Sequence, residues 1–181
     1  MPIALTRSAE EFAARAGALL TAGPGTNLHA TILASVRNAP VASSQALFAT
    51  IEDEGEVVAI ALRSPPRPLI ASAMSAQQAL ELMTQWLRED PEIGGVFAPY
   101  PAASLIAAAW ERLHGGHPRL VVEVLAHHLE RVVAPARPAP GALRAAGPPE
   151  LALLVGWWEA FSIEIRERKP VLMWRRRSVI S

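Results

Sequence analysis

The sequence predicts an α/β fold, a mixed sheet flanked by helices, on three observations. Apolar residues recur at helical spacing in several segments, most clearly at residues 76–88. Residues 46–63 instead alternate with a period of two on either side of an acidic turn at 53–55, which is typical of a β-hairpin. Short apolar runs at 69–71 and 95–98 are each followed by a helical pattern, as in strand–helix units.

The first half of the chain begins with two expected helices. The first, at residues 8–20, has Ser8 as a candidate N-cap, and the second, at 28–38, has Asn27. A Gly-Pro-Gly segment separates them, and Pro40 ends the second. The hairpin at 46–63 follows.

The strand at 69–71 leads into the helix at 76–88, and the strand at 95–98 leads into a helix that begins near Pro101. A Gly-Gly pair ends that helix. Residues 119–131, RLVVEVLAHHLER, then predict one long strand.

Residues 133–149 contain five prolines and predict a linker. A last helix follows, because four apolar residues fall at i, i+3, i+4 and i+7. This apolar stripe consists of Leu151, Leu154, Val155 and Trp158. Fewer than 40 residues follow residue 143, so we expect the stripe to dock on the first domain, on a second copy of the chain or on another protein.

The composition excludes several classes of function. The formal net charge is zero, which argues against a nucleic-acid partner. The chain has no cysteine, so disulfides and thiolate chemistry are excluded. No apolar run of 18 residues predicts a membrane span, and the N-terminus has no signal-like apolar region. We therefore expect a cytoplasmic protein, and the Ala- and Pro-rich composition with one lysine suggests a bacterial source.

The order of these elements resembles the fold of GNAT-type N-acetyltransferases, the acyl-CoA N-acyltransferase fold. The phrases FATIEDEGEVVAIALRSPP, GVFAP and ALRAAGPPELALLVGWWEAF are similar to stretches of bacterial members built from a degenerate first half and a catalytic second half. The resemblance implies a degenerate GNAT-like domain at 1–132, a Pro-rich linker at 133–149 and the start of a truncated second GNAT domain at 150–181. A frameshifted end is another explanation for the abrupt last residues.

The resemblance also implies a reaction, the transfer of acetyl from acetyl-CoA to an amine. In this family a Q/R-x-x-G-x-G/A loop after the fourth strand binds the diphosphate of the cofactor, because glycines let backbone N–H groups approach it at a helix N-terminus. The corresponding residues here are Met74, Ser75, Ala76 and Gln77, and none is glycine. A helix terminus alone contributes roughly 0.3–1 kcal/mol, whereas micromolar affinity needs about 8 kcal/mol. The cofactor is thus acetyl-CoA by resemblance, or none.

Many members also use a tyrosine late in the helix before the final long strand as a general acid. Trp110 occupies the similar position here, and an indole cannot protonate a thiolate. The only tyrosine, Tyr100, is expected to pack. We therefore assign no catalytic residue and expect a GNAT-related protein that is inactive as this chain alone. The alternative function is a non-catalytic interaction or dimerisation module.

The remaining polar residues predict no further site. His114 and His117 have a spacing that can chelate a metal, but no third ligand is evident, so no metal is expected. His127 and His128, adjacent on a strand, would face opposite sides. Glu123 is expected to face outward. The acidic residues of the 46–63 turn are expected to serve solubility, and His29 is expected at the surface or in a cap.

Overall fold

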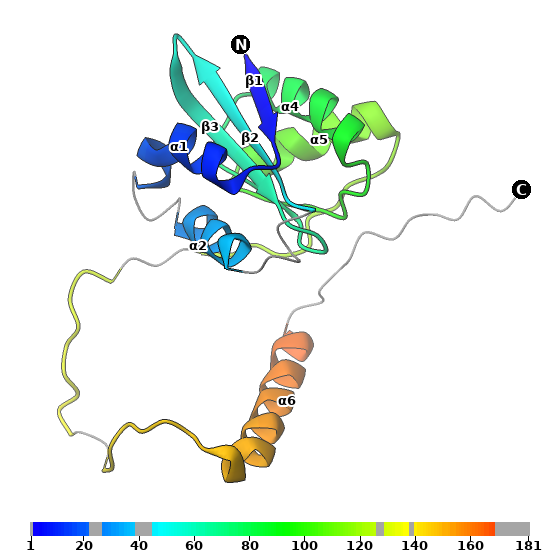
Figure 1. The fold of residues 1–181 in the computed structure, drawn as a ribbon. Coiled ribbons are helices and arrows are strands. Elements are labelled where there is room, and N and C mark those ends of the chain that lie inside the picture. The colour runs from blue at the N-terminus through cyan, green and yellow to red at the C-terminus, as the bar shows by residue number, and fades with distance from the viewer. Residues whose placement is uncertain (1, 22–26, 39–44, 126–128, 138–139, 169–181) are drawn as a thin grey trace, which may run out of the picture. The chain divides into compact units, whose positions relative to one another are not determined.

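The computed structural model describes residues 2–21, 27–38, 45–125, 129–137 and 140–168 (Figure 1). These residues divide between Arg119 and Leu120 into two units.

The first unit contains a five-stranded sheet and four described helices. Its elements are β1 (Ile3–Thr6), α1 (Ala9–Leu20), α2 (Asn27–Arg37), β2 (Leu47–Asp53), β3 (Glu56–Arg63), β4 (Leu69–Ala71), α4 (Ala76–Glu89), β5 (Val96–Phe97) and α5 (Ala102–His114). The strands lie in the order β1-β2-β3-β4-β5, antiparallel as far as β4 and parallel between β4 and β5. The expected mixed sheet flanked by helices is confirmed.

The hairpin of β2 and β3 turns at Glu54 and Gly55, both of which have positive φ (49° and 87°). Two such residues in succession make the tight turn whose twist matches that of the flanking strands. Glycine accepts this conformation without strain, and the predicted hairpin is thereby confirmed at its expected turn.

Helices cover both faces of the sheet, with α1 and α2 on one side and α4 and α5 on the other (Figure 1). Side chains of β2 alternate between the faces: Ala49 packs toward α4 and α5, whereas Phe48 packs toward α1 and α2. The same alternation runs through β3 and β4, and the strands are buried from Leu47 to Ile51, from Ala59 to Arg63 and from Leu69 to Ala71. The core therefore consists of two layers that share the central strands.

The face that meets α4 and α5 is lined by small side chains. Ala49, Ala59, Ala61 and Ala71 are all fully buried there. Their small size lets the bulky residues of α4 come close to the sheet, among them Trp86, which has no exposed surface.

Two sequence predictions differ from the structure. The four-residue strand β1 was not predicted, since its apolar pattern is too short to distinguish from a loop. The strand predicted at 119–131 is wrong for the described part of that range, because residues 119–125 and 129–131 have no strand conformation. His127 and His128 lie outside the described residues.

The second unit contains the short helix η2 (Pro148–Glu150) and the helix α6 (Leu151–Arg168). At its start the Glu150 carboxylate accepts a hydrogen bond from the Gly147 backbone N–H at 2.5 Å and pairs with Arg144. The last predicted helix is thus confirmed. In the part of the chain that the structure describes, no helix is long and apolar enough to cross a membrane.

Candidate functional site

The junction between β4 and α4 is where the sequence places a degenerate cofactor loop. β4 continues its pairing with β3 through Ser72: the Ser72 backbone N–H donates to the Ile60 carbonyl at 2.9 Å, and the Ile60 N–H donates to Ser72 Oγ at 2.9 Å. Ser72 is buried. Four residues later the chain enters α4 with no glycine on the way.

The N-terminus of α4 is closed by its own side chains. Ser75 Oγ accepts from the Gln78 backbone N–H at 3.2 Å, while Gln78 Oε1 accepts from the Ser75 N–H at 2.7 Å. This reciprocal capping box satisfies two backbone donors that would otherwise point at an anion. Of the four predicted positions, Ser75 is thus the helix cap, Met74 precedes it, and Ala76 and Gln77 are the first two residues of α4.

On the other side of the junction, β4 and β5 remain paired over the whole length of β5. Leu69 lies opposite Val96 and Ile70 opposite Phe97, and the Leu69 N–H donates to the Gly95 carbonyl at 3.0 Å. A crevice of only about 10 Å³ lies beside this pair, lined by Met83, Ile93, Gly95, Val96, Ile106, Ala107 and Trp110. That volume holds about one water molecule, so the crevice is too small for a pantetheine arm.

A wider groove, of about 370 Å³, lies between α1 and α2. Its lining is mostly aliphatic and also includes Thr21, Arg37 and Asn38. Several residues adjoining the groove in sequence lie outside the described ranges, so we assign it no ligand.

His29 on α2 is buried with 2 % of its surface exposed, which corrects its expected surface position. Neither ring nitrogen makes a hydrogen bond of normal geometry among the described residues. Burial lowers the pKa of His29, and the nearby backbone of Ala71 opposes this effect only in part. The ring is therefore neutral at pH 7 and lies near the end of β4.

The two histidines at the end of α5 have separate environments. His117 Nδ1 lies 3.0 Å from Glu111 Oε1, whereas the His114 ring packs edge-on against Trp110 at a centroid distance of 5.2 Å. No cluster of three metal-ligating side chains occurs among the described residues. A Cβ atom on Gly116 would lie 2.2 Å from the Trp110 ring, so a larger residue at this turn would displace that ring.

Two other candidates lie at the surface. Tyr100 is 83 % exposed, so its expected packing role is wrong. Glu123 is exposed but in a segment without strand conformation.

At the acidic hairpin, Glu52 pairs with Arg15 at 2.8 Å, an ion pair that joins β2 to α1.

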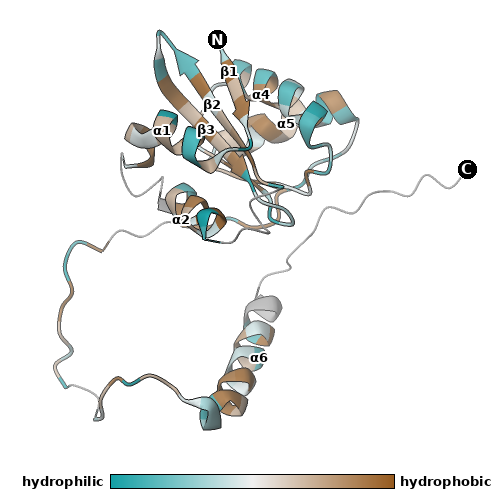
Figure 2. Ribbon diagram, viewed as in Figure 1, coloured by the Kyte–Doolittle hydropathy of each residue, from teal (hydrophilic) through white to brown (hydrophobic). Residues whose placement is uncertain are grey.

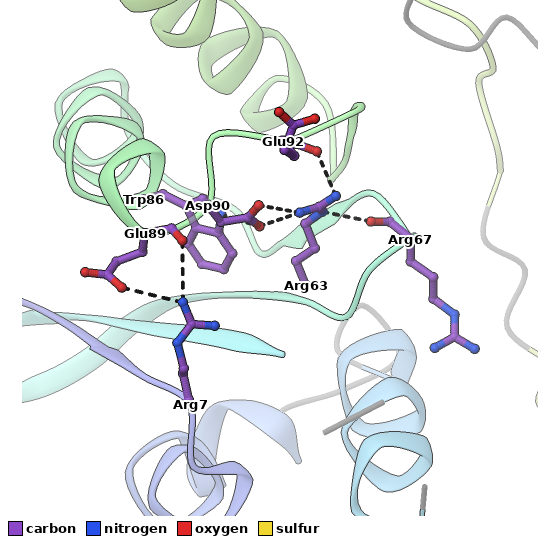
Figure 3. A network of polar contacts seen from close by, with 7 residues as sticks. All are labelled: Arg7, Arg63, Arg67, Trp86, Glu89, Asp90 and Glu92. Carbon is purple, nitrogen blue, oxygen red and sulfur yellow. Dashed lines mark hydrogen bonds and ion pairs between the residues drawn. The ribbon is translucent and has the colours of Figure 1, made fainter. Parts of the chain in front are cut away.

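Arg63, at the end of β3, is the centre of the main polar network (Figure 3). Its guanidinium donates to both carboxylate oxygens of Asp90 at 2.6 and 2.5 Å, to the Arg67 carbonyl at 3.0 Å and to the Glu92 carbonyl at 2.8 Å. The side chains of Arg63 and Asp90 are 7 % and 15 % exposed. Sequence reasoning missed this pair because 27 residues separate its members.

The network connects three segments that meet only in space. Asp90 caps the end of α4, and its carboxylate also accepts a longer hydrogen bond from the Trp86 indole N–H at 3.4 Å. Nearby, the Arg7 guanidinium donates to the Glu89 carbonyl at 3.4 Å and pairs with its carboxylate at 3.5 Å, in an exposed position. Arg63 is paired with Asp90 and Arg7 with Glu89, while Arg67 and Glu92 contribute their backbone carbonyls, and this pairing indicates a structural role.

The apolar surface of the second unit is larger than the predicted stripe. Leu151, Leu154, Val155 and Trp158 are exposed as expected. Other exposed apolar side chains extend around α6, namely Leu153, Trp157, Phe161 and Ile163. Figure 2 shows the first half of α6 coloured as hydrophobic. A helix that is apolar on all sides is normally buried in an assembly.

Comparisons with protein-family models, with curated proteins and with solved structures gave no match to this chain.

Proposed function

We propose that this chain is a non-catalytic relative of the GNAT-type N-acetyltransferases and works as a binding module. The order of the elements supports the relationship: a strand pair, a β4–α4 unit and a β5–α5 unit follow one another as in that fold. The addition of β1 makes Leu69–Ala71 the fourth strand, after which the family has its cofactor loop.

The capping box at Ser75 and Gln78 is the main observation in favour of a non-catalytic chain. A diphosphate needs several free backbone N–H groups that converge on it. Here two of the donors at this helix end are bonded within the chain, and the preceding residues lack the glycines that would allow close approach. Trp110, in place of a tyrosine, offers no proton to a departing thiolate.

The exposed apolar surface of residues 120–163 is the main observation in favour of a binding function. We name this segment the arm. Its exposed apolar side chains include three aromatic rings on α6, at Trp157, Trp158 and Phe161. Aromatic residues of this kind dominate the energetics of protein interfaces. The arm is thus the part of the chain suited to contact with another polypeptide.

Titration calorimetry with acetyl-CoA and with free coenzyme A tests the cofactor part. We expect no binding with a dissociation constant below about 1 mM, which corresponds to about 4 kcal/mol. A GNAT enzyme with an intact glycine loop serves as the positive control. A micromolar site on the folded chain would overturn the proposal.

Acetyl transfer can be measured in parallel by the free thiol that acetyl-CoA releases. The chain has no cysteine, so a thiol reagent detects coenzyme A without background from the protein. We expect the thiol to accumulate no faster with a panel of amines than in buffer alone.

A further inference from the structure

We infer that α2 is a proton-sensitive flap, which separates from the sheet in mild acid when the ring of His29 takes up a proton. This device lies entirely within the first unit and does not depend on the arm or on its proposed binding function. Three features carry it: the place of His29 on α2, the groups around that helix, and the way in which α2 is attached.

His29 belongs to the buried stripe of α2. The members of this stripe are His29, Ile32, Leu33 and Val36, with exposed fractions of 2, 8, 4 and 1 %. The three apolar members belong to the core cluster that α2 forms with α1 and one face of the sheet. His29 is the polar member, at the N-terminal end of the stripe. A proton on its ring would therefore place a charge within an apolar layer.

The acidic residues of α1 are directed to solvent and are already paired. The side chains of Glu10 and Glu11 are 78 % and 53 % exposed. Glu10 pairs with Arg37, the charged residue at the end of α2, at 3.8 Å, and Glu11 pairs with Arg15 at 3.7 Å. Neither carboxylate is buried beside the stripe to which His29 belongs.

The strands under α2 offer no buried carboxylate either, as far as the structure describes them. Glu52, Asp53 and Glu56 lie at the hairpin end of β2 and β3, away from the buried middle of these strands. Arg63 follows Ala61 by two positions and so faces α4, where Asp90 binds it. The strand β4 contains no titratable side chain.

Only the neutral ring fits this environment. Residues 22–26 and 39–44, which flank α2 in the sequence, also contain no titratable side chain. Burial lowers the pKa of His29, and the backbone of Ala71 offsets this effect only in part. Once α2 has separated, the ring is in water, where its pKa is about 6.5. Below that pH the separated helix takes up a proton that the docked helix does not, so acid favours separation.

The helix can separate without breaking the sheet. It lies between α1 and β2 in the chain and contributes to none of the strand pairings. The core cluster on the α4 and α5 face contains no residue of α2. Within the other cluster, Phe12 of α1 stacks on Phe48 of β2 at a centroid distance of 5.0 Å, a contact that does not involve α2. Separation should therefore uncover part of one apolar layer and leave the rest of the first unit folded.

Thiol labelling tests this device, because the natural chain has no cysteine. Val36→Cys places a thiol on the buried stripe of α2, and the matched control Ala79→Cys places one on the buried face of α4. At each pH the labelling rate is divided by that of the same variant unfolded in urea, which removes the effect of thiol ionisation. We expect the thiol on α2 to be labelled at least tenfold faster than the thiol on α4 at every pH.

The pH dependence identifies the group that titrates. Between pH 6.5 and pH 5.0 the labelling of Val36→Cys should rise by about fivefold to thirtyfold, because one proton changes an equilibrium at most tenfold per pH unit. Addition of His29→Leu should hold the rate within about twofold over this range. The matched histidine control, His117→Asn, changes an exposed residue and should keep the full rise. An undiminished rise in the His29→Leu variant would overturn the inference, and so would equal labelling of the thiols on α2 and α4.

Hydrogen exchange of the natural chain gives a measurement that needs no substitution. After correction for intrinsic exchange rates, the amides of α2 should lose protection as the pH falls from 6.5 to 5.0. The amides of β3 should remain at least tenfold better protected than those of α2 at each pH. Constant protection of α2, or equal protection of α2 and β3, would refute the flap. These results do not involve coenzyme A or the arm, so they stand or fall separately from the proposed function.

Discussion

Arg63 shows at the scale of one residue how a buried charge is accommodated in this fold. Its side chain has four hydrogen bonds, two of them to the carboxylate of Asp90. Removal of one partner from a buried pair leaves the other charge without compensation in a poorly solvated site.

The variant Asp90→Ala should therefore lower the free energy of unfolding by about 3–5 kcal/mol in urea titrations. The matched control is Glu89→Ala, which removes the exposed pair with Arg7 and should cost under about 1 kcal/mol. Similar losses for the two variants would contradict the structural role of the Arg63 network.

His29 is a second residue with a specific consequence. Its pKa is lowered in the folded chain because the ring is buried. Below about pH 6.5 the unfolded chain binds a proton at this histidine that the folded chain does not, so acid favours unfolding.

We expect the free energy of unfolding to fall as the pH drops below about 6.5, with a slope of at most about 1.4 kcal/mol per pH unit from this group. The variant His29→Leu should reduce that slope, whereas His117→Asn, at an exposed position, should retain it. Denaturant titrations between pH 7.5 and 5.0 check this, and an unchanged slope in His29→Leu would exclude burial of the ring.

At the scale of elements, local signals predicted most of the first unit. Ser8 caps α1 as expected, with Oγ accepting from the Glu11 N–H at 3.2 Å, and Gly115 ends α5 in the left-handed conformation. Such signals are local, so the sequence reveals them. The strand β1 was missed because four residues carry too little pattern.

The segment at 119–131 shows the opposite error. Its valines favour a strand, but strand formation requires a neighbouring edge, and pattern alone does not supply one. The candidate site also combines local and non-local features. The lack of glycine at 74–77 was evident from the sequence, whereas the burial of His29 and the Arg63–Asp90 pair arise from tertiary packing.

The capping box at the start of α4 gives a prediction at this scale. Ser75→Ala removes the acceptor for the Gln78 N–H and should cost about 0.5–2 kcal/mol of stability, measured by urea denaturation. Ser75→Gly should cost only a few tenths of a kcal/mol. If Ser75→Ala is as stable as the natural chain, this helix end is capped in another way.

At the scale of the whole molecule, the first unit holds both core clusters. The clusters on the two faces of the sheet are built from residues between Ile3 and Trp110. No residue of the arm that the structure describes belongs to either cluster.

A chain truncated after Arg119 should therefore retain a single cooperative thermal transition and its far-ultraviolet circular dichroism. It should also be monomeric and more acidic than the full chain, because residues 120–181 carry the basic excess. Sedimentation velocity checks the mass. Loss of the cooperative transition would indicate that the arm contributes to the core.

The four bonds of Arg63 have a further consequence for how the sheet opens. They hold the end of β3, the Arg67 turn and the segment that leads into β5 through one side chain. Two-residue strands usually fray, and their amides exchange with deuterium quickly. Because Arg63 ties this segment to the core, the amides around Val96 should exchange together with those of β3, as one cooperative unit.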